Sequence, residues 1–251
     1  MKTRVFIVAV AAALFGNAAL VSPSQSAETS QYVVAVGDIA STVGGPQEGV
    51  ATLTKALDPD AVLLLGDLAY KYGSNSDFTK KFLPSWASVL TRYPTYAVPG
   101  NHEYKTKNAN GYRKIVNTYS LPKTGNDLWW VKNVGAYTII GLDSEKLGTG
   151  KNLNAKGQRQ KKFLKAALAN ANGRPTIVTW HRPRYSSGPH GNQRDISVTT
   201  LWKIVSADPD VKLVLWGHDH DFEKKVKEVS GRKLTTMVVG SGGAEAYSCS
   251  S

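Results

Sequence analysis

The chain has 251 residues, 41% of them hydrophobic and 20% charged, a composition that fits a folded globular domain and excludes a disordered chain. Its 23 glycines have no regular period, which excludes a collagen-like fibre. Lys and Arg number 31 against 19 Asp and Glu, so the formal charge is +12. The single cysteine, Cys249, excludes an intramolecular disulfide and a cysteine-rich zinc site, but leaves open a disulfide between two chains. Metal chemistry must therefore use His, Asp, Asn and Tyr.

The N-terminal segment has the pattern of a secretory signal peptide. A basic start is followed by an apolar run over 5–15 and then by small residues, and we expect cleavage near Ser26. The apolar run is too short for a membrane span, although an uncleaved tether is the open alternative. We therefore predict that residues 1–26 are a signal peptide, that 27–251 form a single domain, and that the protein is secreted, with cell-surface association left open.

Short apolar runs that end at Gly or Pro alternate with amphipathic segments along the rest of the chain. In chain order, the pattern predicts a strand over 32–36, a helix over 47–57, strands over 61–65 and 95–99, a hairpin over 128–140 that leads into a strand over 137–144, a helix over 156–170, a strand over 176–180, a helix over 196–205, and strands over 211–216 and 234–243. Within the first helix, Val50, Leu53 and Leu57 form the expected apolar stripe. The alternation predicts a layered α/β domain whose ligands bind at the carboxyl ends of the strands.

Polar residues directly follow five of these strands. The motifs are GDIA with Asp38, GDLAY with Asp67 and Tyr70, GNHE with Asn101 and His102, TWHRP with His181, and GHDH with His218 and His220. Each motif alone has a simpler reading as a turn, a helix cap or a structural histidine. Together they hold four of the five histidines, and the fifth, His190, is nine residues beyond His181. Such a donor set exceeds the needs of one ion, so we expect two ions that share a carboxylate and act on phosphorus.

In order and spacing, these five motifs resemble the calcineurin-like metallophosphoesterase superfamily. Most of that superfamily has a histidine where this chain has Ala40, and this chain has Tyr70 where purple acid phosphatases have a tyrosinate ligand. The resemblance therefore points to the purple acid phosphatase branch. It implies an α/β/β/α sandwich with the metal site at the carboxyl ends of the strands. It covers nearly all of 27–251, which we expect to be one catalytic domain.

The same resemblance implies roles for individual residues. It implies a ferric ion held by Asp38, Tyr70 and His220, a second ion of iron, zinc or manganese held by Asn101, His181 and His218, and a bridging Asp67. His102 matches the family residue that contacts the substrate phosphate and assists the leaving group. His190 matches a substrate-binding histidine by its spacing alone.

The implied activity is that of a metal-dependent acid phosphatase, in which a metal-bound hydroxide attacks small phosphate monoesters. A phosphodiesterase or nuclease on the same dimetal scaffold is one alternative, and a non-catalytic phosphate or polyanion binder is another. The basic residues of 156–165 favour a polyanion binder, but no zinc-finger, helix-turn-helix or RNA-recognition motif indicates specific nucleic-acid binding. The sequence leaves the natural substrate and the oligomeric state open.

Three further groups of residues have two readings each. Arg182 and Arg184 flank the His181 loop and either contact substrate phosphate or form salt bridges at the rim. Asp143 either orients a ligand histidine or forms a turn. The pair Trp129 and Trp130 either lines a substrate groove or packs in the core.

Overall fold

The computed structural model describes residues 5–9 and 31–247, and within them the chain forms two packed β-sheets. The predicted cleavage site near Ser26 and the single cysteine, Cys249, lie outside the described residues. Most of the predicted signal peptide also lies outside them, apart from Val5–Ala9, which forms strand β1. Among the described residues, no helix is long and apolar enough to cross a lipid bilayer.

The first sheet is parallel throughout, with the strand order β1-β2-β3-β4. Its other strands are β2 (Gln31–Val36), β3 (Ala61–Leu64) and β4 (Thr95–Ala97). All four residues of β3 are buried, as expected of a short aliphatic strand covered on both faces. Because these strands are parallel, the loops that follow β2, β3 and β4 all leave the sheet at the same edge.

The second sheet is mixed, with the order β11-β12-β10-β9-β6-β5. Its parallel strands are β6 (Tyr137–Gly141), β9 (Thr176–Thr179), β10 (Val211–Trp216) and β12 (Arg232–Val239). Antiparallel strands form both edges, β5 (Trp130–Val134) and β11 (Phe222–Val229). The pairing of β5 with β6 confirms the predicted hairpin. A separate short ribbon contains β7 (Gly148–Thr149) and β8 (Asn152–Leu153).

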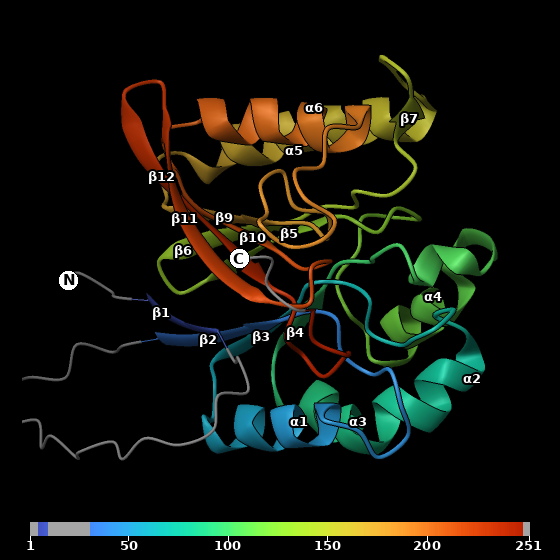
Figure 1. Cartoon of the computed structure of the whole chain (residues 1–251). Helices are drawn as coiled ribbons and strands as arrows, with labels where there is room; N and C mark the ends of the chain where they lie inside the picture. The colour runs from blue at the N-terminus through green and yellow to red at the C-terminus, as the bar shows by residue number, and fades with distance from the viewer. Residues whose placement is uncertain (1–4, 10–30, 248–251) are drawn as a thin grey trace, which may run out of the picture.

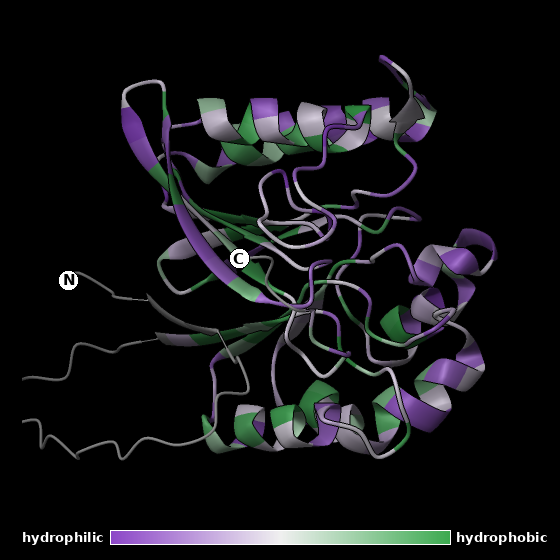
Figure 2. Ribbon diagram, viewed as in Figure 1, coloured by the Kyte–Doolittle hydropathy of each residue, from purple (hydrophilic) through white to green (hydrophobic). Residues whose placement is uncertain are grey.

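The two sheets pack face to face, and helices cover both outer faces (Figure 1). The first sheet is covered by α1 (Gln47–Ala56) and α3 (Leu83–Arg92), and the second by α5 (Ala155–Ala171) and α6 (Ile196–Ala207). Aliphatic side chains of both sheets, including Leu63 and Leu215, form the core between them. Figure 2 shows this hydrophobic interior and the more hydrophilic edge strand β11. The predicted α/β/β/α sandwich is therefore confirmed.

The three predicted helices are present, but the apolar face of α1 differs from the prediction. Leu53 is 43% exposed, so its place in the expected stripe is wrong. The buried face instead contains Gln47, Val50, Ala51 and Thr54. On this face the Thr54 hydroxyl donates to the Val50 carbonyl within the helix. A buried polar residue is tolerated there because its hydrogen bond is satisfied locally.

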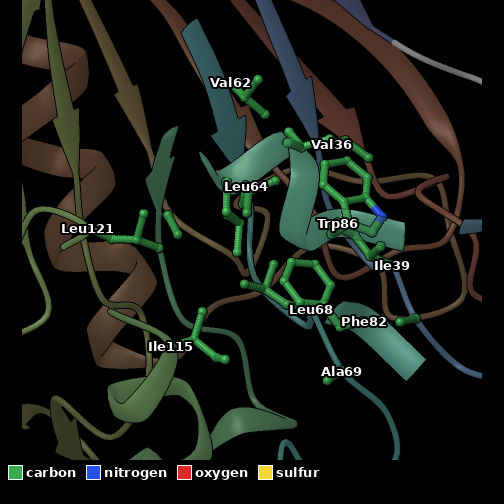
Figure 3. Packing of buried hydrophobic residues seen from close by; sticks show 14 of the residues in the cluster. Val36, Ile39, Val62, Leu64, Leu68, Ala69, Phe82, Trp86, Ile115 and Leu121 are labelled. Carbon is green, nitrogen blue, oxygen red and sulfur yellow. The ribbon is translucent and has the colours of Figure 1, made fainter. Parts of the chain in front are cut away.

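Several helical segments around β4 have no counterpart in the predictions. Before β4, α2 (Asn75–Asp77) begins at a capping box made by Ser74 and leads through the π-helix η1 (Phe78–Phe82) into α3. After β4, the 3₁₀ turns η2 (Glu103–Lys105) and η3 (Lys107–Ala109) precede α4 (Asn110–Thr118). Aromatic anchors hold this region: the rings of Phe82 and Trp86 stack with centroids 5.8 Å apart beneath the first sheet (Figure 3). The two rings are four residues apart, a helical spacing that continues across the junction of η1 and α3.

The paired tryptophans belong to the core. Trp129 is 2% exposed and Trp130 is 1% exposed, which confirms the packing interpretation and excludes the groove. The Trp130 indole N–H donates to the Ala97 carbonyl at 2.6 Å. This bond connects β5 of the second sheet to β4 of the first, and so helps fix the position of one sheet on the other.

Candidate metal centre

The five motifs predicted from the sequence meet at the carboxyl ends of the two sheets. The loops after β2, β3 and β4 supply Asp38, Asp67, Tyr70 and Asn101, and the loops after β9 and β10 supply His181, His218 and His220. The first sheet thus contributes the oxygen donors and the second sheet contributes the histidines. All seven residues predicted as metal ligands lie around one site, which forms only because the sheets face each other.

Tyr70 is at the centre of the first group of donors. Its hydroxyl lies 2.8 Å from Asp38 Oδ1, to which it donates, and 3.0 Å from His220 Nε2. The same hydroxyl lies 3.3 Å from Asp67 Oδ2. His220 Nε2 is 3.6 Å from Asp38 Oδ1. These three side chains therefore converge with Asp67 on one point, as the resemblance implied.

His181 is at the centre of the second group. Its Nε2 atom lies 3.2 Å from Asp67 Oδ2 and 3.2 Å from Asn101 Oδ1. Donor atoms of Asp67, His181 and His218 all lie within 4.8 Å of one another. Asp67 Oδ2 is therefore in contact with a member of each group, Tyr70 and His181. This is the placement expected of a carboxylate that bridges two ions.

Backbone carbonyls orient two of the histidines. His181 Nδ1 lies 2.9 Å from the Leu65 carbonyl oxygen, and His220 Nδ1 lies 2.7 Å from that of Glu245. A carbonyl accepts only from an N–H, so in both residues Nδ1 holds a proton and Nε2 faces the site. The rings are thus held in the orientation that binding a metal through Nε2 requires.

The motif glycines let the backbone pack directly against the carboxylates. A Cβ atom on Gly217 would lie 2.6 Å from Asp38 Oδ2, and one on Gly100 would lie 2.3 Å from Asp67 Oδ1. The His218 backbone N–H donates to Asp38 Oδ2 at 2.7 Å, which leaves Oδ1 toward the site. Asp38, Asp67 and His218 all have positive φ, at 59°, 51° and 77°. Such backbone strain is typical of residues that are held for function.

The electrostatics of the site fit a bound cation. Burial raises the pKa of Asp38 well above its usual range, and burial together with the Asp38 and Asp67 carboxylates raises the pKa of Tyr70. Burial also opposes ionisation of Asp67, but the positive charge of His181 outweighs burial and lowers the pKa of Asp67. Burial likewise disfavours the charged form of His181, but the Asp67 carboxylate outweighs it and raises the pKa of His181 to about 10. Among the described residues, no Lys or Arg nitrogen lies within 4 Å of either carboxylate. Two adjoining buried acids without a lysine or arginine partner are a poor arrangement by themselves and a good one around metal ions.

The chemistry of the donors agrees with this reading. Carboxylate, phenolate and amide oxygens suit hard cations, and imidazole nitrogen suits borderline transition metals. Both groups combine oxygen with nitrogen and share Asp67. The residues therefore fit two neighbouring metal ions.

His102 lies at the mouth of the site, beside the first group. Its ring centroid is 4.3 Å from that of Tyr70, and its Nε2 is 3.8 Å from Asp67 Oδ2. Nδ1 lies 2.8 Å from the Lys71 carbonyl oxygen, and the His102 backbone N–H donates to Asp67 Oδ1 at 2.8 Å. The side chain is 19% exposed, so substrate has access to it. This is where a residue that contacts substrate is expected.

His190 lies at the rim beside the second group. Its ring centroid is 4.2 Å from that of His218, and its side chain is 40% exposed. Asp219 holds it: Asp219 Oδ1 lies 2.7 Å from His190 Nδ1 and accepts from the His190 backbone N–H at 3.0 Å. The prediction from spacing therefore placed His190 at the site. Asp219 was not predicted, although its position between the two histidines of GHDH is a signal that could have identified it.

Glu103 is a second residue that the sequence analysis missed. It is fully buried, and its carboxylate accepts from the backbone N–H groups of Asp67 at 2.9 Å, Leu68 at 2.9 Å and Gly100 at 2.7 Å. Burial raises its pKa to about 7, with the Asp67 charge adding to the effect. The GNHE motif contains it, but only the folded chain shows that it connects two ligand loops.

The structure also shows the contacts of Arg182, Arg184 and Asp143, for which the sequence allowed two interpretations each. Arg182 forms a rim ion pair with Glu145, Nε to Oε1 at 2.8 Å, and its Nη1 atom is 3.2 Å from His218 Nε2. Arg184 instead lies over the Tyr185 ring at 4.7 Å. Asp143 forms the turn: its Oδ1 accepts from the Glu145 backbone N–H at 2.9 Å.

Asp143 therefore does not orient a ligand histidine among the described residues. Its other oxygen, Oδ2, pairs with Lys156 Nζ at 2.6 Å and accepts from the Tyr104 hydroxyl. The second-sphere role considered from the sequence is wrong, because this carboxylate faces α5 and not the metal-ligand loops.

The chain is thus a two-sheet α/β sandwich with two adjoining groups of metal donors at the strand ends. The chain belongs to the calcineurin-like phosphoesterase family, whose sequence model matches residues 32–222. The family depends on a dinuclear metal centre, and the two adjoining donor groups are in keeping with this.

Individual relatives are distant. An uncharacterised protein of Mycobacterium tuberculosis is 24% identical over 210 residues, which cover 74% of this chain and 39% of that protein. The purple acid phosphatase from yellow lupin (Lupinus luteus) seeds has a TM-score of 0.69 at 20% identity, over 87% of this chain and 45% of that one. A dimetal phosphatase from Danio rerio has a TM-score of 0.61 at 10% identity, over 82% and 86%. The chain spans about two fifths of the length of the mycobacterial relative.

Proposed function

We propose that this chain is a secreted dimetal phosphatase of the purple acid phosphatase type, which hydrolyses small phosphate monoesters at acidic pH. The observation that carries the proposal is the position of the Tyr70 hydroxyl, 2.8 Å from Asp38 Oδ1 and 3.0 Å from His220 Nε2. A phenol within a carboxylate and imidazole donor group suits a hard trivalent ion such as Fe(III). The acidic pH range and the secretion rest on the sequence patterns.

Two ions share this donor set in the proposal. Asp38, Tyr70 and His220 would hold the Fe(III) ion, Asn101, His181 and His218 would hold a divalent iron, zinc or manganese ion, and Asp67 would contact both. When bound, such a pair of ions supplies Lewis-acid activation of water and neutralises charge on the phosphate.

In the proposal, side chains at the mouth of the site protonate the leaving group and bind the phosphate. The Lys71 carbonyl, 2.8 Å from Nδ1, fixes the His102 ring so that Nε2 can hold a proton for the departing alcohol oxygen. His190, fixed by Asp219, and Arg182, fixed by Glu145, lie beside His218 and can donate hydrogen bonds to the phosphate oxygens. Both are positioned before substrate arrives, which reduces the cost of ordering them in the transition state.

The deciding experiment is a visible absorption spectrum with metal analysis on the same purified sample. We expect two metals per chain including iron, and a broad band in the green-to-yellow region that is lost in Tyr70→Phe. Tyr72→Phe is the matched control, because Tyr72 is two residues away and 56% exposed. A colourless protein with two zinc or manganese ions would refute the purple-type assignment and leave a dimetal phosphoesterase.

Assays with p-nitrophenyl phosphate and bis-p-nitrophenyl phosphate test the substrate class. We expect the monoester to be hydrolysed with the higher kcat/KM. A preference for the diester would replace the proposal with a phosphodiesterase or nuclease on the same scaffold. No tightly bound metal, together with no hydrolysis of either ester after metal addition, would refute the enzyme proposal as a whole.

A further inference from the structure

We infer that Lys105 and Lys71 form a binding site for a second negative charge on the substrate. The favoured substrates are then phosphate monoesters whose leaving alcohol carries a carboxylate or another phosphate group. This inference rests on the proposed function, because it requires the leaving group to lie beside His102.

The geometry places the Lys105 ammonium group and the Lys71 backbone beside the His102 ring. Lys105 Nζ lies 3.0 Å from Nδ1 and 3.3 Å from Nε2 of His102, at the end of the η2 turn that follows it. The Lys71 carbonyl is 2.8 Å from Nδ1. Both lysines are exposed residues, so their ammonium groups remain accessible from solvent. An alcohol oxygen that accepts a proton from His102 thus brings the rest of the alcohol next to the Lys105 ammonium group, with Lys71 in the loop alongside.

Among the described residues, the positive charges of Lys105 and Lys71 are not paired with a carboxylate. Partial burial lowers the pKa of Lys105, and repulsion from Lys71 lowers it further, although Asp67 opposes the shift. In the described part of the chain, no carboxylate oxygen lies within 4 Å of either ammonium group. The adjacent Glu103 carboxylate is unavailable, because it is buried and accepts three backbone N–H groups. A cation beside an imidazole, with a second cation close enough to repel it, is a suitable place for an anion.

Other lysines of the chain contrast with this pair. Lys81 is 3.0 Å from Asp77, Lys156 is 2.6 Å from Asp143, and Lys225 is 2.6 Å from Glu223. A generally basic surface would raise the affinity for every phosphate ester alike. A charge pair on the leaving-group side would instead favour esters with an additional negative charge in the alcohol, and this difference can be measured.

The test compares kcat/KM for matched substrates with the metal-loaded full chain. Glycerol 3-phosphate and 3-phosphoglycerate differ by a carboxylate in the leaving group, and fructose 6-phosphate and fructose 1,6-bisphosphate differ by a phosphate. We expect the wild type to favour the more anionic member of at least one pair. Lys105→Ala and Lys71→Ala should each reduce that preference by roughly three- to tenfold, the effect of one partly screened charge. The ratio of kcat/KM within each substrate pair is the decisive quantity. A substitution beside His102 can change the turnover of every substrate, but such a general change cancels in the ratio.

Lys107→Ala is the matched control, since Lys107 is exposed and only two residues beyond Lys105. A reduced ratio in one substrate pair alone identifies the second group as a carboxylate or as a phosphate. Three results would overturn the inference: wild-type kcat/KM ratios near one, ratios unchanged in both lysine variants, or an equal loss in Lys107→Ala. In each case, hydrolysis of glycerol 3-phosphate would still support the proposed function. If protein with two bound metals hydrolyses none of the four esters, the proposed function is refuted and the inference with it.

Discussion

The Glu103 carboxylate accepts the backbone N–H of Asp67 at 2.9 Å, so the side chain predicted to bridge two metals is held from behind by a second, buried acid. The same carboxylate accepts from Gly100, one residue before Asn101, at 2.7 Å. Glu103 thereby connects the loops after β3 and β4. Three backbone hydrogen bonds offset the free-energy cost of removing the Glu103 carboxylate from water.

Glu103→Gln should therefore weaken the fold and the site together. A glutamine has one acceptor oxygen, and its NH₂ group would face a backbone N–H. We expect a loss of about 2 kcal/mol in the free energy of unfolding, from unsatisfied buried donors, and a lower metal content. Urea unfolding of metal-free protein and metal analysis measure the two effects. Glu228→Gln, on exposed β11, is the control. Unchanged stability in Glu103→Gln would contradict the role given to these bonds.

Asp67→Asn should remove both ions and not one. Asp67 Oδ2 lies 3.3 Å from the Tyr70 hydroxyl and 3.2 Å from His181 Nε2, so each donor group loses a charged ligand. We expect fewer than one metal per chain after gel filtration and no measurable phosphatase activity. Retention of both metals at wild-type levels would show that Asp67 does not bridge.

His102→Ala should lower turnover without removing metal. Its Nε2 is 3.8 Å from Asp67 and the ring is at the solvent-exposed mouth, where it can act on substrate. Loss of a general acid typically costs about 10²- to 10⁴-fold in rate, and we expect kcat to fall within that range with two metals still bound. Loss of metal in His102→Ala would instead make it a ligand or a structural residue.

Asp219→Asn should act on substrate binding through His190. Asp219 Oδ1 is 2.7 Å from His190 Nδ1, and the carboxylate is completely buried. We expect KM to rise by about tenfold, as for loss of one positioned hydrogen bond, and expect His190→Ala to show the same change. In the double variant the effects should not add. Additive effects would indicate that Asp219 and His190 act separately. Asp221→Asn is the control, because Asp221 Oδ1 has no hydrogen-bond partner among the residues that the structure describes.

Asp77 gives a prediction for stability against pH. Its carboxylate caps α2 through Ser74 and lies 3.0 Å from Lys81 Nζ. Partial burial opposes ionisation, but the Ser74 and Lys81 contacts outweigh it and lower the pKa of Asp77 below its usual range. A lowered pKa in the folded state means that the stabilisation is present above the usual pKa of Asp and is lost as the pH falls through the folded value.

Asp77→Asn should accordingly reduce the stability of metal-free protein by ~1 kcal/mol at neutral pH, and by progressively less under acid conditions. Urea unfolding at several pH values measures this difference. An equal loss at every pH would show that Asp77 acts through packing and not through its charge.

Local patterns were sufficient for much of the fold. The aliphatic runs that became β2, β3 and β10 are short and end at glycine, so strands buried on both faces were predictable. The failure at Leu53 has a physical reason: periodicity gives an apolar face, but the neighbouring sheet decides which side of α1 is buried. The helices between β3 and β4 were missed because α2 has only three residues and a π-helical turn separates it from α3.

The sequence by itself determined which donors the protein has and that they follow strands, because both are local properties. Tertiary structure alone decided that Asp67 Oδ2 lies between Tyr70 and His181, residues 111 positions apart. It also decided that Glu103 holds two loops and that the Lys71 backbone carbonyl and the Lys105 ammonium group both contact the His102 ring. These contacts depend on how two sheets pack face to face and how loops from different strands cross. Side-chain packing between distant segments fixes that geometry, and the periodicity of any one segment contains no record of it.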